Sequence, residues 1–356
     1  TYRLLAEEGE DAFYRGEIAR LMVAAMQADS GIITAEDLAA YRPKIRRPVL
    51  GSYRGFTVYS MPPPSSGGVH LIQMLNILER YDLGYLGHNS SETIHLMAEA
   101  MKRAFADRSV YMGDPGFHDI PVAGLLAKAY ADSLSHSISR FRASKIQGPG
   151  NPTPYLPGDG PSRGQHTTHL SVIDRWGNMV AMTATINTGF GSGLVAPGTG
   201  ILLNNEMDDF SAAPGVENFF GLVGDEANSI APRKRPLSSM TPTFLFYQGR
   251  PFMILGSPGG PRIITTVLQA ILNVIEHNMD IQAAVDAPRI HHQWKPDKLY
   301  LEDGIPADVI QNLVIKGHEV APGGNWGAAE AILIDLETGI LYGGTDSRIE
   351  GAAKGY

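Results

Sequence analysis

A turn-rich segment that leads into Thr167-Thr168-His169 constrains this chain more than any other feature of its sequence. Glycine and proline crowd residues 148–164, and residues 168–174 then alternate between polar and apolar side chains, as in a half-buried strand. A precursor that cut itself before Thr167 would make this threonine a new N-terminus. Its own α-amine, with an ordinary pKa of about 7.7 to 8.0, could then take the proton of the hydroxyl nucleophile. The alternative is a threonine that only occupies a strand, where threonine is common.

Composition limits the classes of protein to consider. The chain has 356 residues, of which 43% are hydrophobic and 19% charged, as in a globular enzyme with a large core. A net charge of −8 without a basic stripe argues against a nucleic-acid partner. The absence of cysteine excludes disulfides, thiolate metal ligands and cysteine nucleophiles, although it does not fix the compartment. No apolar run approaches the roughly 18 to 20 residues of a membrane span, so we expect none.

Periodicity predicts both helices and strands. Apolar residues at helical spacing predict helices over residues 10–28, 69–80 and 262–278, and a fourth that Asn89 caps, with Glu92 three residues on. Alternation predicts a strand over residues 55–60 and three hairpins, which pair residues 168–174 with 179–187, 243–247 with 252–255, and 331–335 with 340–342. Between the first strand and the helix at residue 69, a proline run predicts a rigid corner, with direct substrate contact as the alternative.

Several separate motifs accompany Thr167-Thr168-His169. They are MPPPSSGG (residues 61–68), LNNEMDDF (203–210), RPLSSM (235–240), GSPGG (256–260) and APRIHHQW (287–294). With these motifs the chain resembles the γ-glutamyltranspeptidase family of N-terminal-nucleophile hydrolases over nearly all its length. The resemblance implies an α+β fold, the four-layer αββα sandwich. It also implies a γ-glutamyl transferase and hydrolase that cleaves amides such as glutathione, without a cofactor or a metal.

The resemblance also divides the chain. It implies autoproteolysis between His166 and Thr167, with residues 1–166 as the C-terminal part of a large-subunit region and residues 167–356 as the small-subunit region. The first part includes the linker that precedes the cut, about residues 148–166. The two pieces would form a heterodimer, in the periplasm or outside the cell. Because the family's large subunit is longer and this chain starts without Met, we expect further sequence upstream.

Four residues would carry the chemistry. Thr167 would be the nucleophile, and the resemblance assigns Thr185 the role of orienting it. Pro261 suits the start of the helix at Arg262, so Gly259 and Gly260 would lie at a helix N-terminus with free N–H groups. By resemblance these two glycines form the oxyanion hole. The alternatives are a tight strand-to-helix turn and a strand threonine that bonds to its neighbour.

A γ-glutamyl group presents an ammonium and a carboxylate, so its pocket needs acceptors at one end and donors at the other. The resemblance makes Asn187, Glu206 and Asp209 the ligands of the ammonium, and Ser238 and Ser239 the donors to the carboxylate. Asn187 would share a strand face with Thr185. The family adds an arginine from a region outside this chain. Without the family, Asp208-Asp209 would be a solvated acidic pair or part of a calcium site.

Three further features leave alternatives open. Residues 214–224 resemble the lid loop of the family, with Phe220 where many relatives have tyrosine, although an aromatic that anchors a core is the alternative. His169 shares a strand face with Thr167 and is therefore a rival general base. His291 and His292 point to opposite faces of a strand, which favours structural roles over a metal site.

Two rival functions remain at this stage. One is a glutaryl or cephalosporin acylase of the same family, whose substrate would lack the α-amine that Asn187, Glu206 and Asp209 are expected to bind. The other is an uncleaved, non-catalytic scaffold or precursor. No zinc-protease, nucleophile-elbow or nucleotide-binding motif occurs in the sequence.

Overall fold

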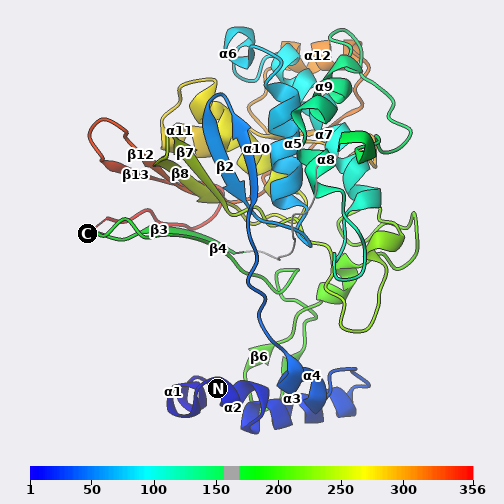
Figure 1. The fold of residues 1–356 in the computed structure, drawn as a ribbon, viewed down its shortest axis with the longest axis vertical. Coiled ribbons are helices and arrows are strands. Elements are labelled where there is room, and N and C mark those ends of the chain that lie inside the picture. Colours follow the sequence, from blue (N-terminus) through cyan, green and yellow to red (C-terminus); the bar gives the residue numbers. More distant parts are fainter. Residues whose placement is uncertain (156–167, 356) are drawn as a thin grey trace. The chain divides into compact units, whose positions relative to one another are not determined.

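The computed structural model describes residues 1–155 and 168–355. The chain divides into two compact units, which we describe separately (Figure 1). The first unit comprises Thr1–Ile45 and Thr185–Glu206, and the second comprises Arg46–Ala184 and Met207–Tyr356.

The first unit is a small helical cluster with a short hairpin. Its elements are α1 (Tyr2–Glu8), α2 (Glu10–Tyr14), α3 (Glu17–Ala28), α4 (Ala35–Ala40), β5 (Val195–Ala196) and β6 (Ile201–Leu202). The single helix predicted over residues 10–28 is wrong, because the chain breaks between α2 and α3. The backbone N–H groups of Arg15 and Gly16 both donate to Asp11 O, at 2.9 and 2.7 Å. A Cβ atom at Gly16 would lie 2.9 Å from Ala12 Cα, so this corner requires glycine.

A six-stranded sheet is the centre of the second unit. Its order is β1-β2-β7-β8-β12-β13, and every neighbouring pair is antiparallel. The strands are β1 (Val49–Tyr53), β2 (Phe56–Ser60), β7 (Thr243–Tyr247), β8 (Arg250–Gly256), β12 (Glu330–Ile334) and β13 (Leu341–Thr345). The predicted hairpins β7–β8 and β12–β13 are therefore confirmed. Strand β2 belongs to the sequence before Thr167 and pairs along its length with β7, which follows Thr167.

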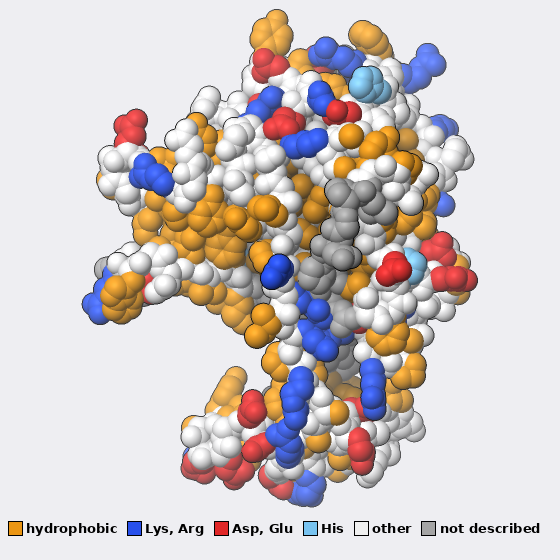
Figure 2. Space-filling view, in the orientation of Figure 1, with side chains coloured by type: hydrophobic (Ala, Val, Ile, Leu, Met, Phe, Trp, Pro, Cys, Tyr) orange, Lys and Arg blue, Asp and Glu red, His pale blue; other side chains and the backbone are white. Residues whose placement is uncertain are grey.

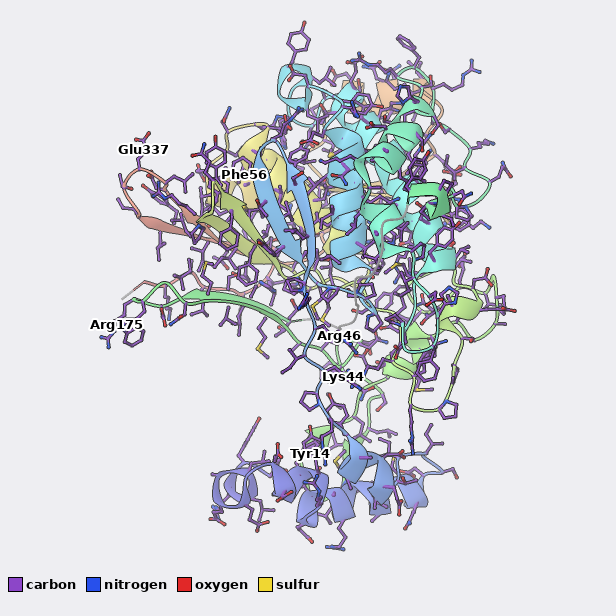
Figure 3. All side chains as sticks on the ribbon, viewed as in Figure 1. Tyr14, Lys44, Arg46, Phe56, Arg175 and Glu337 are labelled. Carbon is purple, nitrogen blue, oxygen red and sulfur yellow. The ribbon has the colours of Figure 1, made fainter. Side chains whose placement is uncertain are left out.

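Helices cover one face of this sheet and a second, smaller sheet lies on the other (Figure 1). The helices against the large sheet are α5 (Gly67–Leu78), α10 (Arg262–Ile275) and α11 (Ile281–Asp286). The small sheet is the hairpin of β3 (His169–Ile173) and β4 (Met179–Thr183), which packs on β8 and β12. It confirms the third predicted hairpin, although β4 ends four residues before the predicted end. Figure 3 shows Arg175 at the tip of β3–β4 and Glu337 at the tip of β12–β13.

The outer face of β3–β4 is apolar and exposed. Leu170 lies opposite Met182, and Val172 lies opposite Val180. All four side chains are exposed by 41% to 50%. The described residues thus form a helical layer and two sheet layers of an αββα sandwich, and the face on which a fourth layer would pack is open. Figure 2 shows broad apolar areas on the side of the second unit where the strands lie.

The remaining helices of the second unit pack against α5 or against one another. The remaining elements are α6 (Leu83–Leu86), α7 (Ser91–Tyr111), α8 (Val122–Leu126), α9 (Lys128–His136), α12 (Ala307–Ile315), the strands β9 (Ile290–His291), β10 (Leu299–Leu301) and β11 (Val320–Pro322), and three short 3-10 turns. Helix α7 is buried along most of its length. No helix among the described residues is long and apolar enough to cross a lipid bilayer.

The predicted N-cap of α7 is wrong by one residue. Ser90 is the cap, since its Oγ accepts from Thr93 N at 3.1 Å. Asn89 instead has a φ of 49° and donates its side-chain N–H to Pro288 O at 2.9 Å. Both residue types cap helices well, so sequence alone does not choose between them.

Candidate functional site

The predicted site residues fall into both units. Thr167 and His166 lie outside the described residues. Thr185, Asn187 and Glu206 belong to the first unit. The second unit holds Asp209, Phe220, Ser238, Ser239, Gly259 and Gly260. We therefore describe each unit's share of the site by itself.

The predicted oxyanion hole forms the turn between β8 and α10. Gly259 and Gly260 have φ values of 134° and 57°, which L-residues rarely adopt. Their carbonyls accept from the first N–H groups of α10, Arg262 N at 3.2 Å and Ile263 N at 3.1 Å. Within residues 1–155 and 168–355, no acceptor bonds the N–H of either glycine. The turn therefore offers backbone donors beside the positive end of the α10 dipole.

Phe220 lies directly against this turn. A Cβ atom at Gly260 would lie 2.9 Å from Cδ1 of the Phe220 ring, so the contact requires glycine. Gln293 Nε2 donates to Phe220 O at 3.0 Å and fixes the backbone at that point. The neighbouring Phe219 is 69% exposed. The loop thus places one ring on the glycine turn and the other in solvent, which agrees with either a lid or an anchor.

The proline corner supports the two predicted carboxylate-binding serines from behind. Ser66 donates to Ser238 O from both its N–H and its Oγ, at 2.8 and 2.7 Å. Ser238 N donates in return to Pro64 O at 2.9 Å, and Ser65 Oγ donates to Met240 O at 2.7 Å. Ser65 and Ser66 are fully buried in these contacts. These contacts support the prediction of a rigid corner over the alternative of direct substrate contact.

The hydroxyls of Ser238 and Ser239 are arranged as donors. Ser238 Oγ accepts from Met240 N at 3.2 Å, and Ser239 Oγ accepts from Arg108 Nη2 at 3.3 Å. An amide and a guanidinium can only donate, so both oxygens accept and both protons remain. Within the described part of the chain, neither proton has an acceptor. Two such hydroxyls suit an anion such as a carboxylate.

Asp209 is fixed relative to these serines through Asn228. The Asn228 side chain donates to Asp209 O at 2.7 Å and accepts from Leu237 N at 2.9 Å. Asp209 itself is buried. A buried carboxylate and a pair of hydroxyl donors are thus tied to one asparagine, and together they present the two kinds of group that an amino acid's charges require.

Arg108 is a residue that the sequence analysis missed. It lies on α7, is only 5% exposed, and contacts Ser66 as well as Ser239. The spacing could have revealed it, because Ile94, Met97, Met101 and Phe105 form the predicted apolar stripe of this helix and position 108 continues that stripe. A charged residue at a core position is unusual and marks a functional or paired group.

In the first unit, Thr185 and Asn187 form a turn. Strand β4 ends at Thr183, so the predicted extension to residue 187 and the shared strand face are wrong. Thr185 Oγ1 accepts from Asn187 N at 2.8 Å, and Asn187 has a φ of 75°. Its side-chain N–H donates to Asn205 O at 3.1 Å, while Oδ1 has no hydrogen-bond partner among the described residues. Glu206 N donates to Asn204 Oδ1 at 2.9 Å. Asn187 thus keeps an acceptor available.

His169 is held in a chain of hydrogen bonds. Ser171 Oγ donates to Glu330 O at 3.2 Å, so it accepts from His169 Nε2 at 3.1 Å. His169 Nδ1 then accepts from Thr183 Oγ1 at 2.9 Å. Burial lowers the pKa of His169 to about 4. Because its one lone pair is already bonded, His169 is a poor general base.

The two adjacent histidines bond to different partners. His291 contacts Thr265 Oγ1 and Gln293 Oε1, both at 3.0 Å, whereas His292 Nε2 lies 3.2 Å from Asp297. Another trio, His95, Glu99 and His318, brings ligand atoms of the kinds that bind metals within 4.8 Å of one another. Most of its atoms already bond within the protein, although His318 Nδ1 has no hydrogen-bond partner among the described residues. His95 bonds to His318 at 2.7 Å, and Glu99 accepts from Lys102 and Arg103.

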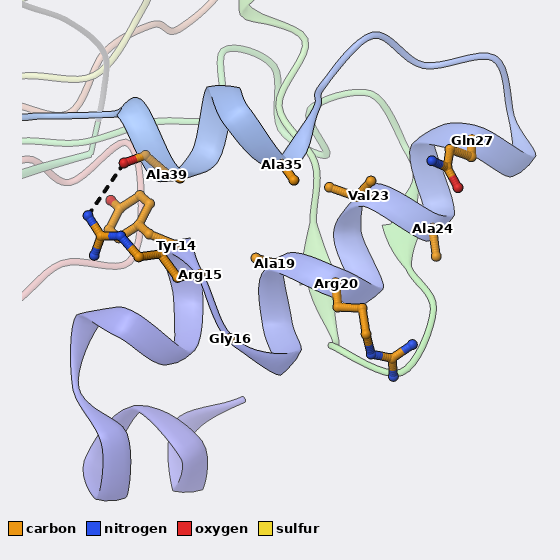
Figure 4. A pocket seen from close by; sticks show the side chains of 10 residues that line it. All are labelled: Tyr14, Arg15, Gly16, Ala19, Arg20, Val23, Ala24, Gln27, Ala35 and Ala39. Carbon is orange, nitrogen blue, oxygen red and sulfur yellow. Dashed lines mark hydrogen bonds between the residues drawn. The ribbon is translucent and has the colours of Figure 1, made fainter.

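A hollow of the first unit lies elsewhere (Figure 4). It is lined by Tyr14, Arg15, Gly16, Ala19, Arg20, Val23, Ala24, Gln27, Ala35 and Ala39. Arg15 Nη2 donates to Ala39 O at 3.4 Å. None of the predicted site residues lines it, and most of its wall is small and apolar. It offers no group for acyl transfer.

Comparison with known proteins identifies the family of this chain. A family model described as gamma-glutamyltranspeptidase matches residues 1–356. A glutathione hydrolase proenzyme of Escherichia coli (strain K12) is 48% identical over 360 residues, which cover 100% of this chain and 60% of that protein. An acylase ACY 1 proenzyme of Pseudomonas sp. (strain SE83) is 44% identical over 321 residues, which cover 90% of this chain and 54% of that protein.

Solved structures agree as well. A cephalosporin acylase from Bacillus halodurans superposes with a TM-score of 0.85 and 31% identity, over 99% of this chain and 62% of that one. This similarity confirms the predicted α+β fold class. The chain spans 60% of the length of its Escherichia coli relative. On the match over its whole length, this chain belongs to the γ-glutamyltranspeptidase family.

Proposed function

We propose that this chain is the catalytic part of a γ-glutamyl transferase and hydrolase that acts on γ-amides such as glutathione. One observation carries the proposal: Asn228 ties a buried carboxylate, Asp209, to the segment that presents the hydroxyls of Ser238 and Ser239. Such a pair fits a substrate with an ammonium and a carboxylate on one carbon. By resemblance to the family, Asn187 and Glu206 remain predicted ligands of the ammonium.

The reaction would be acyl transfer through Thr167. Its hydroxyl oxygen attacks the γ-carbonyl carbon while its α-amine takes the hydroxyl proton. The N–H groups of Gly259 and Gly260 stabilise the oxyanion, and Thr185 orients the nucleophile. The C–N bond then breaks, and the leaving amine takes the proton from the α-amine. Water or an amino acid attacks the resulting γ-glutamyl ester, which releases the product and restores Thr167.

The nucleophile requires a cut between His166 and Thr167. The pieces would have 166 and 190 residues (356 − 166 = 190). Residues 1–166 would belong to the large subunit, with about 148–166 as its pre-cleavage linker, and residues 167–356 would be the small subunit of a heterodimer. Phe220 would be the lid residue. We place the protein in the periplasm or outside the cell, on the resemblance alone.

N-terminal sequencing of the purified natural protein tests the cut. We expect a second N-terminus at Thr167 and hydrolysis of γ-glutamyl-p-nitroanilide. Thr167→Ala should remain uncut and inactive, whereas Thr167→Ser should cut slowly because a hydroxyl remains. Efficient cleavage of the alanine variant would remove Thr167 from the mechanism, and a single intact wild-type chain would favour a scaffold or a precursor.

An acylase is the second candidate, since an acylase proenzyme is among the relatives. Its substrates would include glutaryl amides, which keep the carboxylate but lack the α-amine. A higher kcat/KM for glutaryl-p-nitroanilide than for γ-glutamyl-p-nitroanilide would favour the acylase.

A further inference from the structure

Arg108 is a buried cation whose hydrogen bonds go to hydroxyls. Its Nε donates to Ser66 Oγ at 2.9 Å and its Nη2 donates to Ser239 Oγ at 3.3 Å. Within the described residues, no carboxylate forms an ion pair with it. Burial lowers the pKa of Arg108 to about 10, against the opposing attraction of Asp209. The side chain is therefore still positively charged at neutral pH.

These contacts decide where the hydroxyl protons point. A guanidinium has no acceptor, so Ser66 and Ser239 must both accept from it. Ser66 Oγ then donates its proton to Ser238 O, which locks the backbone between the two serines of the pair. Ser239 must direct its own proton away from Arg108.

The position of this charge fits the ligand expected there. A buried cation without its own carboxylate is costly, and a negatively charged ligand close by would offset that cost. Asp209 supplies part of the balance from the ammonium side of the site. A carboxylate that accepts from Ser239 would supply the rest, one hydroxyl away from the guanidinium.

We propose that Arg108 is a positioning residue for the substrate carboxylate: it holds the Ser239 hydroxyl as a donor and adds a positive charge behind it. The inference rests on the proposed function and deepens it. Arg108 acts through Ser239 and does not touch the substrate. Selectivity for substrates with an α-carboxylate would thus depend on a residue of α7 in the large-subunit region.

The test is Arg108→Lys in the natural full-length enzyme, with two substrates. Lysine keeps the charge but cannot reach two hydroxyls in the same fork geometry. KM for γ-glutamyl-p-nitroanilide should rise roughly 10- to 100-fold, the range for a lost hydrogen bond to a charged group, with a much smaller change in kcat. For 4-aminobutyryl-p-nitroanilide, which lacks the carboxylate, kcat/KM should stay within about threefold of wild type. Inhibition constants of L-glutamate and 4-aminobutyrate should show the same contrast.

Arg103→Lys is the matched control. Arg103 lies on the same helix, is equally buried, and donates to Glu99 and Ser137. Its replacement should lower stability but leave the ratio of the two kcat/KM values unchanged. Equal losses on both substrates in Arg108→Lys would overturn the proposal, because a general packing defect would then explain them.

Two further variants keep the proposal testable if Arg108→Lys does not fold. Ser66→Ala removes the acceptor of Arg108 Nε and should give a smaller loss with the same selectivity; no selective loss overturns the proposal. In a Ser239→Ala background, Arg108→Lys should cost little more, because both act on one contact. A wild-type enzyme that is inactive on γ-glutamyl-p-nitroanilide would refute the proposed function itself, whereas an active wild type with an unselective Ser66→Ala refutes only the role of Arg108.

Discussion

Two buried charged networks lie along helix α7, and they differ in whether their cations meet a carboxylate of the protein. Around Glu99, the carboxylate accepts from Lys102, Arg103 and the backbone of Ser144, at 2.8 to 3.0 Å. Cations and anion meet within the protein, so this network is closed. Around Arg108, the guanidinium donates to the hydroxyls of Ser66 and Ser239. Ser66 passes its proton on to Ser238 O, whereas the Ser239 proton has no acceptor among the described residues. Burial and charge are similar in both, and only the open hydrogen-bonding capacity distinguishes a candidate ligand site from a structural pair.

Breaking the closed network should have the largest effect on stability. Glu99→Gln leaves buried Arg103 without a carboxylate and leaves Lys102 with only the more distant Asp297, at 3.6 Å, which should cost about 3 to 5 kcal/mol in the free energy of unfolding. Urea unfolding of the uncut Thr167→Ala precursor, with and without Glu99→Gln, measures this. In the active enzyme, Glu99→Gln should not change the ratio of kcat/KM for γ-glutamyl-p-nitroanilide to kcat/KM for 4-aminobutyryl-p-nitroanilide. A loss below about 1 kcal/mol would show that the network is not closed by Glu99.

The stability that Glu99 contributes should also depend on pH. Burial raises the pKa of Glu99, but Lys102, Ser144 and Arg103 more than offset it and lower the pKa to about 2. A lowered carboxyl pKa stabilises the fold above the unfolded value of 4.5, and this contribution is lost as pH falls toward 2. The Glu99→Gln precursor should lack this loss.

His169 of β3, two residues after Thr167 in the sequence, tests a second closed network. With a pKa near 4, His169 favours the fold above pH 6.5, and about 3 kcal/mol is lost as pH falls through 4. His169→Ala should remove that pH dependence of stability. It should leave the acidic limb of the kcat/KM profile in place, since we assign the limb to the α-amine of Thr167. Disappearance of the limb would make His169 the base.

The smallest of these free-energy changes is expected for Asp209→Ala, near the open network, and it should depend most on the substrate. Asp209→Ala would remove the charge-assisted contact that we propose for the ammonium, and the loss should cost roughly 1.5 to 3 kcal/mol in transition-state binding of γ-glutamyl substrates. Glutaryl-p-nitroanilide has no ammonium and should be affected far less. Comparing kcat/KM on both anilides decides the matter, and equal losses would contradict the assignment of Asp209.

Local patterns predicted the elements but not their exact ends. The hairpins follow from alternation, and the glycine turn before α10 follows from residues that tolerate positive φ. The helix over residues 10–28 failed because its break depends on a contact of Gly16 with the preceding turn. The predicted extension of β4 to residue 187 failed because the Thr185 side chain accepts a hydrogen bond from Asn187 N and so competes with the hydrogen bonds of a strand.

The candidate site residues that belong to sequence motifs could be named from the sequence. The residue that only a tertiary contact brings to the site could not. Ser238, Ser239, Gly259 and Gly260 came from motifs. Arg108 is no part of any of the motifs used, and only packing of α7 against the proline corner reveals its two serine partners. Charge at a stripe position could have drawn attention to it, but the sequence does not show which groups it would meet.

The pairing of β2 with β7 has a consequence for the cut that we propose before Thr167. If the chain is cut before Thr167, one central sheet is thereafter built from two separate polypeptides. The uncut precursor folds as a single molecule, at a rate that does not depend on concentration. Once the cut is made, the loss of structure is also a dissociation, and recovery requires two fragments to meet in solution. Maturation would then be a one-way step: a mature molecule that is denatured at low concentration has lost the connection by which it first assembled.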